Sequence, residues 1–139
     1  MPDLSPGLGS GWKRESGGTF GEFQARNYLQ LRLPGLRAST AAAGWAGDRY
    51  DVYAHDDDSV AVFRLVFADD TQATEFRAAQ NELLGATGAK VSAGGGMTLA
   101  SRPDGNTTAR RSNAGRQVFF AIGSSADAAR RAISLLGGG

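Results

Sequence analysis

The spacing of apolar residues divides the first half of the chain into two helical segments and two strands. A helix is predicted from Thr19, where a capping-box spacing opens it, to about Leu33, where Pro34-Gly35 stops it, and residues 36–43 again favour a helix. Residues 49–54 and 59–67 are β-like. The second of these, SVAVFRLVF, is apolar on both faces, which is typical of a central strand.

The second half predicts a helix, three strands and a last helix. Asp69 to about Leu84 reads as a capped helix, followed by a flexible glycine-rich connection over 85–96. A final helix begins after Ser124 or Ser125, because apolar residues follow it at i, i+3, i+4 and i+7 spacing. The three strands between these helices cover 97–102, 107–111 and 116–122, and two turn-forming segments separate them.

The resulting order is αα-ββ-α-βββ-α. Strands joined as hairpins and closed by helices predict an α+β fold, with an antiparallel sheet of about five strands and helices packed on one face. We expect a linker or irregular N-terminal arm over 1–18, one α+β domain over 19–136, and a glycine tail over 137–139.

The segment AAAGWAGDRYDVY, residues 41–53, marks the change from helix to strand. Gly44 is placed to be a left-handed helix stop, and we expect Trp45 to be mostly buried at this corner. At the start of the preceding helix, Thr19 and Glu22 have the spacing of a capping box.

Composition excludes several classes of protein. The chain has 139 residues, 41% of them hydrophobic, which suits one globular domain. Fifteen Lys and Arg balance fourteen Asp and Glu, so no overall field favours nucleic acid. The lack of cysteine excludes disulfides and thiolate zinc sites. No apolar run is long enough to span a membrane.

No catalytic or metal-binding pattern stands out, and we expect no enzyme activity and no cofactor. His55, the only histidine, precedes three aspartates in a predicted turn that lacks calcium-loop spacing. A solvated turn is the favoured interpretation, with a weak cation site as the alternative.

Candidate binding residues come from the helix-to-strand corner and from the late arginines. An aromatic and guanidinium cluster can bind a small ligand or an anion, and arginine forks suit carboxylates and phosphates. Alternation along 107–111 places Arg110 and Arg111 on opposite faces, which weakens the case for one basic patch. The candidates are Trp45, Arg49, Tyr50, Arg102, Arg110 and Arg116.

Part of the chain resembles the C-terminal region of uncharacterised bacterial proteins of Chloroflexi and actinobacterial type. The resemblance lies in three segments, GTFGEFQARNYL, AAAGWAGDRYDVY and VFRLVFADDTQATEF. The resemblance covers about residues 7–80 and rests mainly on the GWxGDRY motif, residues 44–50. It implies a piece of a longer exported protein, hence an extracellular or cell-surface location, behind a segment similar to zinc metallopeptidases. This chain departs from the pattern at Ala46 and at Phe67-Ala68-Asp69-Asp70, and it has no His-Glu-x-x-His sequence.

These observations predict a non-catalytic accessory or protein-interaction domain. Its partners would be other domains of a longer chain or a second copy of itself, and not nucleic acid. The alternative is a small-ligand or anion-binding domain, which requires a concave apolar pocket with polar groups converging in it.

Overall fold

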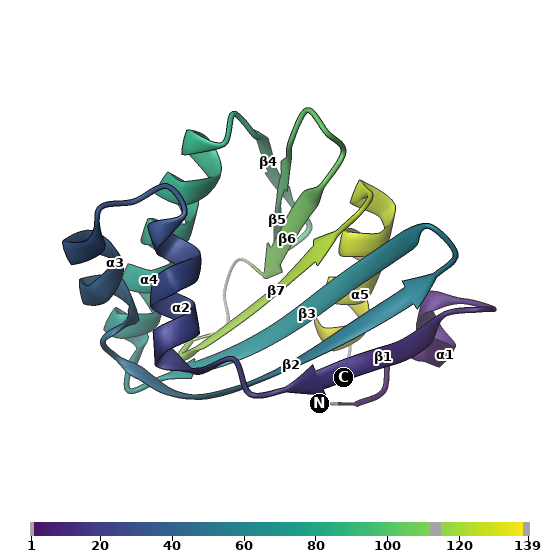
Figure 1. Cartoon of the computed structure of the whole chain (residues 1–139), viewed down its shortest axis with the longest axis horizontal. Helices are drawn as coiled ribbons and strands as arrows, with labels where there is room; N and C mark the ends of the chain where they lie inside the picture. The colour runs from purple at the N-terminus through teal and green to yellow at the C-terminus, as the bar shows by residue number, and fades with distance from the viewer. Residues whose placement is uncertain (1, 112–114, 138–139) are drawn as a thin grey trace.

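A computed structural model, which describes residues 2–111 and 115–137, shows an α+β fold built on one antiparallel sheet (Figure 1). The strand order is β1-β2-β3-β7-β6-β5-β4, so β3 and β7 lie at the centre. Within the described residues there are seven strands, against the five or so expected, and five helices. The strands are β1 Lys13–Gly18, β2 Trp45–His55, β3 Asp58–Phe67, β4 Lys90–Gly94, β5 Met97–Ser101, β6 Thr107–Arg111 and β7 Gln117–Gly123, and the helices are α1 Ser5–Leu8, α2 Gly21–Gln30, α3 Gly35–Ala42, α4 Asp70–Ala86 and α5 Ala126–Gly137.

The two strands that we did not expect, β1 and β4, are the two edges of the sheet. Residues 13–18 lie in the expected irregular arm, and residues 90–94 lie in the expected flexible connection. Every residue of β4, and all of β1 except Gly18, is exposed. Such strands are held by backbone pairing to one neighbour, so they show no apolar alternation from which to predict them.

Helices cover both faces of the sheet, and the prediction of a single covered face was wrong. On the front face, α2, α3 and α4 bury Phe63, Leu65, Phe67, Val118 and Phe120. On the back face, α5 and the short α1 bury a second cluster that includes Val60, Val62 and Ala121. The correction has a plain physical reason: β3 and β7 are apolar on both faces, so both faces need a covering layer.

Two of the predicted helix caps are confirmed and two are corrected. The Asp69 side chain accepts from the Gln72 amide at 2.8 Å, and Ser125 Oγ accepts from the Ala128 amide at 3.2 Å. Thr19 does not cap α2, which has no side-chain cap from its own first turn. Gly44 does not adopt the left-handed backbone conformation that was predicted. A residue without a side chain is needed here because α4 passes close by, and a Cβ at this position would lie 2.5 Å from Cβ of Gln72.

Candidate functional site

A cavity of about 510 Å³ lies on the front face, between α2, the end of α4 and the sheet. Its size is that of a small-molecule site. The inner wall is formed by Leu83 and Leu84 of α4, Thr108 of β6 and Ile122 of β7, and Tyr28 of α2 lines it as well. The cavity is therefore a largely apolar chamber between helices and a sheet.

Two arginines, from opposite sides, belong to the lining of this cavity. Arg32 follows α2, and Arg102 follows β5; both are exposed. Arg102 forms an ion pair with Asp104, with Nη2 and Oδ2 3.4 Å apart. Arg32 forms no ion pair with any residue that the structure describes, and its Nη1 donates to the carbonyl of Leu31 at 2.9 Å. The cavity lining thus combines apolar side chains with two exposed arginines, of which only Arg102 pairs with a described carboxylate.

A third arginine, Arg110, is buried next to this region without a carboxylate among the described residues. Its side chain comes from β6 on the same face as Thr108, and the residue is 6% exposed. Nη1 donates to the carbonyl of Arg77 at 3.2 Å and to Oε1 of Gln80 at 3.0 Å, while Nε is buried with no hydrogen-bond partner. A buried guanidinium held only by neutral oxygens is costly, because charge is expensive to remove from water.

Gln80 connects Arg110 to the cavity wall. Its Nε2 donates to the hydroxyl oxygen of Tyr28 at 3.0 Å. Burial raises the pKa of Tyr28 to about 12, against the smaller opposing effects of the Gln80 hydrogen bond and of Arg110. Burial also lowers the pKa of Arg110, and the positive charge of Arg77 lowers it further. The chain Tyr28–Gln80–Arg110 therefore places a desolvated positive charge behind the cavity wall.

The GWxGDRY segment has a structural use that explains two of its residues. Asp48 on β2 accepts the backbone amides of Phe20 and Gly21, both at 2.6 Å, and so caps the start of α2. The indole Nε1 of Trp45 donates to the same carboxylate at 2.9 Å. Trp45, which we expected to be mostly buried, is partly buried against the front-face core.

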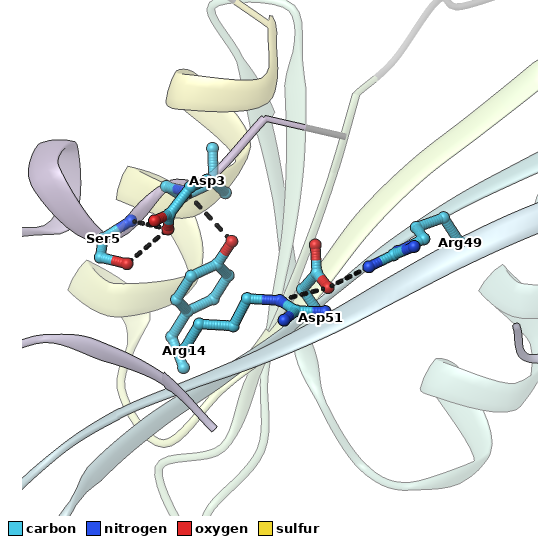
Figure 2. A network of polar contacts seen from close by, with 7 residues as sticks. Asp3, Ser5, Arg14, Arg49 and Asp51 are labelled. Atoms are coloured by element: carbon cyan, nitrogen blue, oxygen red, sulfur yellow. Dashed lines mark hydrogen bonds and ion pairs between the residues drawn. The ribbon is translucent and has the colours of Figure 1, made fainter. Parts of the chain in front are cut away.

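The next residues of the motif lie around a buried carboxylate on the back face. Figure 2 shows Arg14 and Arg49 approaching Asp51 from its two sides. Nε of Arg14 lies 2.8 Å from Oδ1 of Asp51, and Nη2 of Arg49 lies 3.5 Å from the same oxygen. Asp51 is 2% exposed, whereas both arginines keep solvent contact. This ion pair ties the edge strand β1 to β2.

The structure does not bring the six sequence-predicted binding residues into one site. Three of them, Trp45, Arg49 and Tyr50, belong to β2, and Trp45 and Tyr50 pack against the front-face core while Arg49 pairs with Asp51. Arg102 lines the cavity and Arg110 lies buried behind it. Arg116 is exposed in the turn before β7. Arg110 and Arg111 do lie on opposite faces, as predicted: Arg110 contacts α4, and Arg111 lies over the ring of Phe119.

Several residues of the site were not found by sequence reasoning. Tyr28 and Arg32 fall within the predicted helix from Thr19 to about Leu33, Gln80 within the helix that begins at Asp69, and Asp51 within the strand 49–54, and none of them was predicted as a site residue. Gln80 alone gave a usable signal, since it falls at an apolar position of the α4 stripe and is fully buried. A polar side chain in such a position has to find a buried partner.

Other features of the described residues add no site. No group of three or more His, Cys, Asp or Glu among them is arranged to hold a metal ion. His55 lies 5.8 Å from the ring of Trp12 and 3.4 Å from a carboxylate oxygen of Asp56. No helix within 2–111 and 115–137 has the length and apolar character needed to cross a membrane.

The fold and cavity define an α+β domain with an arginine-lined apolar chamber. Residues 11–132 match the family described as Domain of unknown function (DUF8575), and the chain belongs to this family. No curated protein matches the chain, and no solved structure matches it.

Proposed function

We propose that this domain is a non-catalytic binding domain whose ligand is a small amphipathic anion held in the cavity between α2, α4 and the sheet. One observation carries the proposal: an apolar chamber of about 510 Å³ has Arg32 and Arg102 in its lining and buried Arg110 behind its wall. Among the described residues, Asp104 is the one carboxylate that forms an ion pair with any of these three arginines, and it pairs with Arg102. An apolar tail in the chamber and an anionic group at its mouth would satisfy both features.

The resemblance of the GWxGDRY segment to longer bacterial proteins suggests where this binding domain would act. In this proposal the domain serves as an accessory module of a longer exported protein whose other parts include a metallopeptidase-like segment. Binding by this module would then localise or regulate the longer chain, and the domain itself would perform no chemistry.

A test uses dodecanoate as the probe, with dodecanol as its uncharged match, in competition with the fluorescent anion anilinonaphthalene sulfonate. We expect dodecanoate to displace the dye and dodecanol to do so much less well. Amide chemical shifts should change around Tyr28, Leu83 and Ile122, which line the cavity.

The double variant R32Q/R102Q removes both cavity arginines and should weaken dodecanoate binding at least about thirtyfold, because each of the two charged hydrogen bonds contributes about 1 kcal/mol or more. Arg26→Gln is the matched control, since Arg26 also belongs to α2 but lies over the ring of Phe23, away from the cavity lining. Equal affinity for dodecanoate and dodecanol, or equal loss in both variants, would overturn the proposal.

A protein-interaction role is the second candidate, and exposed apolar side chains favour it. Phe23 and Leu31, on α2 and its end, are 62% and 65% exposed, and Leu36 at the start of α3 is 82% exposed. Large exposed apolar groups are typical of association surfaces. Light scattering of the wild type and of L36S would test this role: concentration-dependent association that the substitution abolishes supports it, and a monomer at all concentrations counts against it.

A further inference from the structure

Arginines cross the back face of the sheet in a row, on the part that α5 leaves uncovered. Arg49 of β2 is directly paired with Arg64 of β3, and Arg64 is directly paired with Phe119 of β7. Arg111 of β6 lies with its guanidinium 5.5 Å from the centre of the Phe119 ring. We call Arg49, Arg64, Phe119 and Arg111 the arginine row.

The arginines of the row lie beside the back-face helix layer, while Phe119 packs against the edge of the cluster that this layer buries. The buried residues that α5 and α1 cover on β3 are Val60 and Val62, near the beginning of that strand. In Figure 1, α5 lies behind the part of the sheet where β3 begins and β7 ends. Further along, Arg49 is exposed, Arg64 and Val66 are partly exposed, and a Cβ added at Gly47 would meet open space. These positions on the back face are therefore at least partly accessible.

The charges of the row are poorly balanced within the described part of the chain. Arg49 shares Oδ1 of Asp51 with Arg14. Arg64 donates to a neutral amide, Oε1 of Gln117, at 2.7 Å. Arg111 forms no ion pair with a described residue, and its guanidinium lies over the ring of Phe119. Like charges placed directly opposite each other destabilise a sheet, and the Asp51 carboxylate offsets only the Arg49 side of the Arg49–Arg64 pair, so a further anion beside Arg64 would stabilise it.

We propose that the arginine row is a docking surface for an acidic amphipathic helix of a partner protein. Neighbouring strands are about 4.8 Å apart, so Arg49 and Arg64 are one strand spacing apart and Arg64 and Arg111 are two, roughly 10 Å. Acidic residues at i, i+3 or i+4 and i+7 on one helix face recur at similar intervals, roughly 5 and 10 Å. The guanidinium forks match carboxylates, and the partly exposed Val66, Phe119 and Met97 provide apolar contact beside them.

The same geometry disfavours single-stranded nucleic acid as the occupant. Binding of that kind uses aromatic side chains on which successive bases stack. Phe119 is the one aromatic residue of the row, and Arg111 already covers its ring. The bound helix would instead continue the layer that α5 begins, which is how sheet faces are normally covered.

The test uses a fluorescein-labelled amphipathic helical peptide of about 20 residues, with glutamates at these spacings beside a leucine stripe. Fluorescence anisotropy would compare wild-type protein with R64Q/R111Q and, as a second variant at an exposed position, R49Q. Thermal melts establish that each variant is folded. The control is R26Q/R130Q, which removes two arginines from α2 and α5 outside the row.

We expect the peptide to bind wild type and the control alike, to bind R64Q/R111Q at least about tenfold more weakly, and to be released as salt rises. The proposal is overturned if the wild type does not bind the peptide, or if R64Q/R111Q and R49Q bind it as the wild type does. It is also overturned if a lysine version of the peptide binds equally well, or if the protein prefers oligo(dT). R32Q/R102Q should bind the peptide normally, so failure here and failure of the cavity proposal are separate results.

Discussion

Asp48 on β2 accepts the backbone amide of Phe20 at 2.6 Å, so a residue from the GWxGDRY segment caps a helix that begins 27 residues earlier in the chain. The same carboxylate accepts the amide of Gly21, also at 2.6 Å. The first amides of a helix have no partner within the helix, and a carboxylate there also complements the helix dipole. The motif therefore fixes the position of α2, which forms one side of the cavity.

We predict that Asp48→Ala lowers the free energy of unfolding by about 2 kcal/mol, the upper end for loss of a helix cap. Urea denaturation measures the loss. Thr19→Ala is the matched control, because Thr19 is the local residue that sequence rules select but it makes no cap hydrogen bond. Its effect should stay within about 0.5 kcal/mol. Equal losses in the two variants would show that the cap is local after all.

Gly17 and Gly18 provide a second test, this time of the ion pair that ties β1 to β2. A Cβ at Gly17 would collide with the Asp51 carboxylate and the Arg14 guanidinium, and it would lie 2.9 Å from the carbonyl of Tyr50. A Cβ at Gly18 meets nothing closer than 3.6 Å. We expect Gly17→Ala to cost about 2 kcal/mol, because it separates buried Asp51 from its nearest cation, whereas Gly18→Ala should change stability by less than about 0.5 kcal/mol.

Urea denaturation of both glycine variants gives the comparison. Repeating Gly17→Ala in an Arg14→Ala background should reduce its cost, since the ion pair is already lost there. A cost that is unchanged in that background would mean that backbone crowding alone, and not the ion pair, explains the effect.

The pKa of Tyr28 predicts a specific pH dependence of stability. Burial raises this pKa from 10 to about 12, so the folded protein holds the phenol proton more tightly than the unfolded chain does. The stabilising contribution is complete below pH 10 and is lost as the pH rises from about 10 to 12. We expect unfolding curves to show this decline and Tyr28→Phe to make it shallower. The difference in tyrosinate absorbance between the folded wild type and folded Tyr28→Phe isolates the Tyr28 titration, and a Tyr28 titration near pH 10 would contradict the assignment.

The centre of the fold could be predicted from the sequence because local signals and tertiary needs agree there. The segment SVAVFRLVF forms the central strand β3, and the α4 stripe through Phe76 and Leu83 is buried. Asp69 and Ser125 cap their helices because each partner amide lies three residues away. In each case the side chains that produce the sequence pattern are the same ones that make the contacts in the folded structure.

The remaining features depend on residues that are distant in sequence. The Asp48 cap joins two elements that no short pattern relates, and the edge strands β1 and β4 are held by backbone pairing. The cavity is lined by residues of α2, α4, β6, β7 and the turn after β5, which no periodicity relates to one another. The arginine row needs the strand register, and Arg49 and Arg64 become neighbours only once β2 and β3 pair.

The indole of Trp45 and the carboxylate of Asp48 should prove energetically coupled. Nε1 of Trp45 donates to Oδ2 of Asp48 at 2.9 Å, and that oxygen also accepts the Gly21 amide. In a double-mutant cycle with Trp45→Phe and Asp48→Ala, we expect a coupling free energy of about 1 kcal/mol, because each single change removes the same charged hydrogen bond. Trp12→Phe is the control partner, since Trp12 packs against the back-face cluster beside His55 and should be additive with Asp48→Ala. Urea denaturation of the variants supplies all the values. Additivity for Trp45 and Asp48, or coupling of the same size for Trp12, would mean that the tryptophan of the GWxGDRY motif acts through packing alone and leaves its indole hydrogen free to serve a ligand.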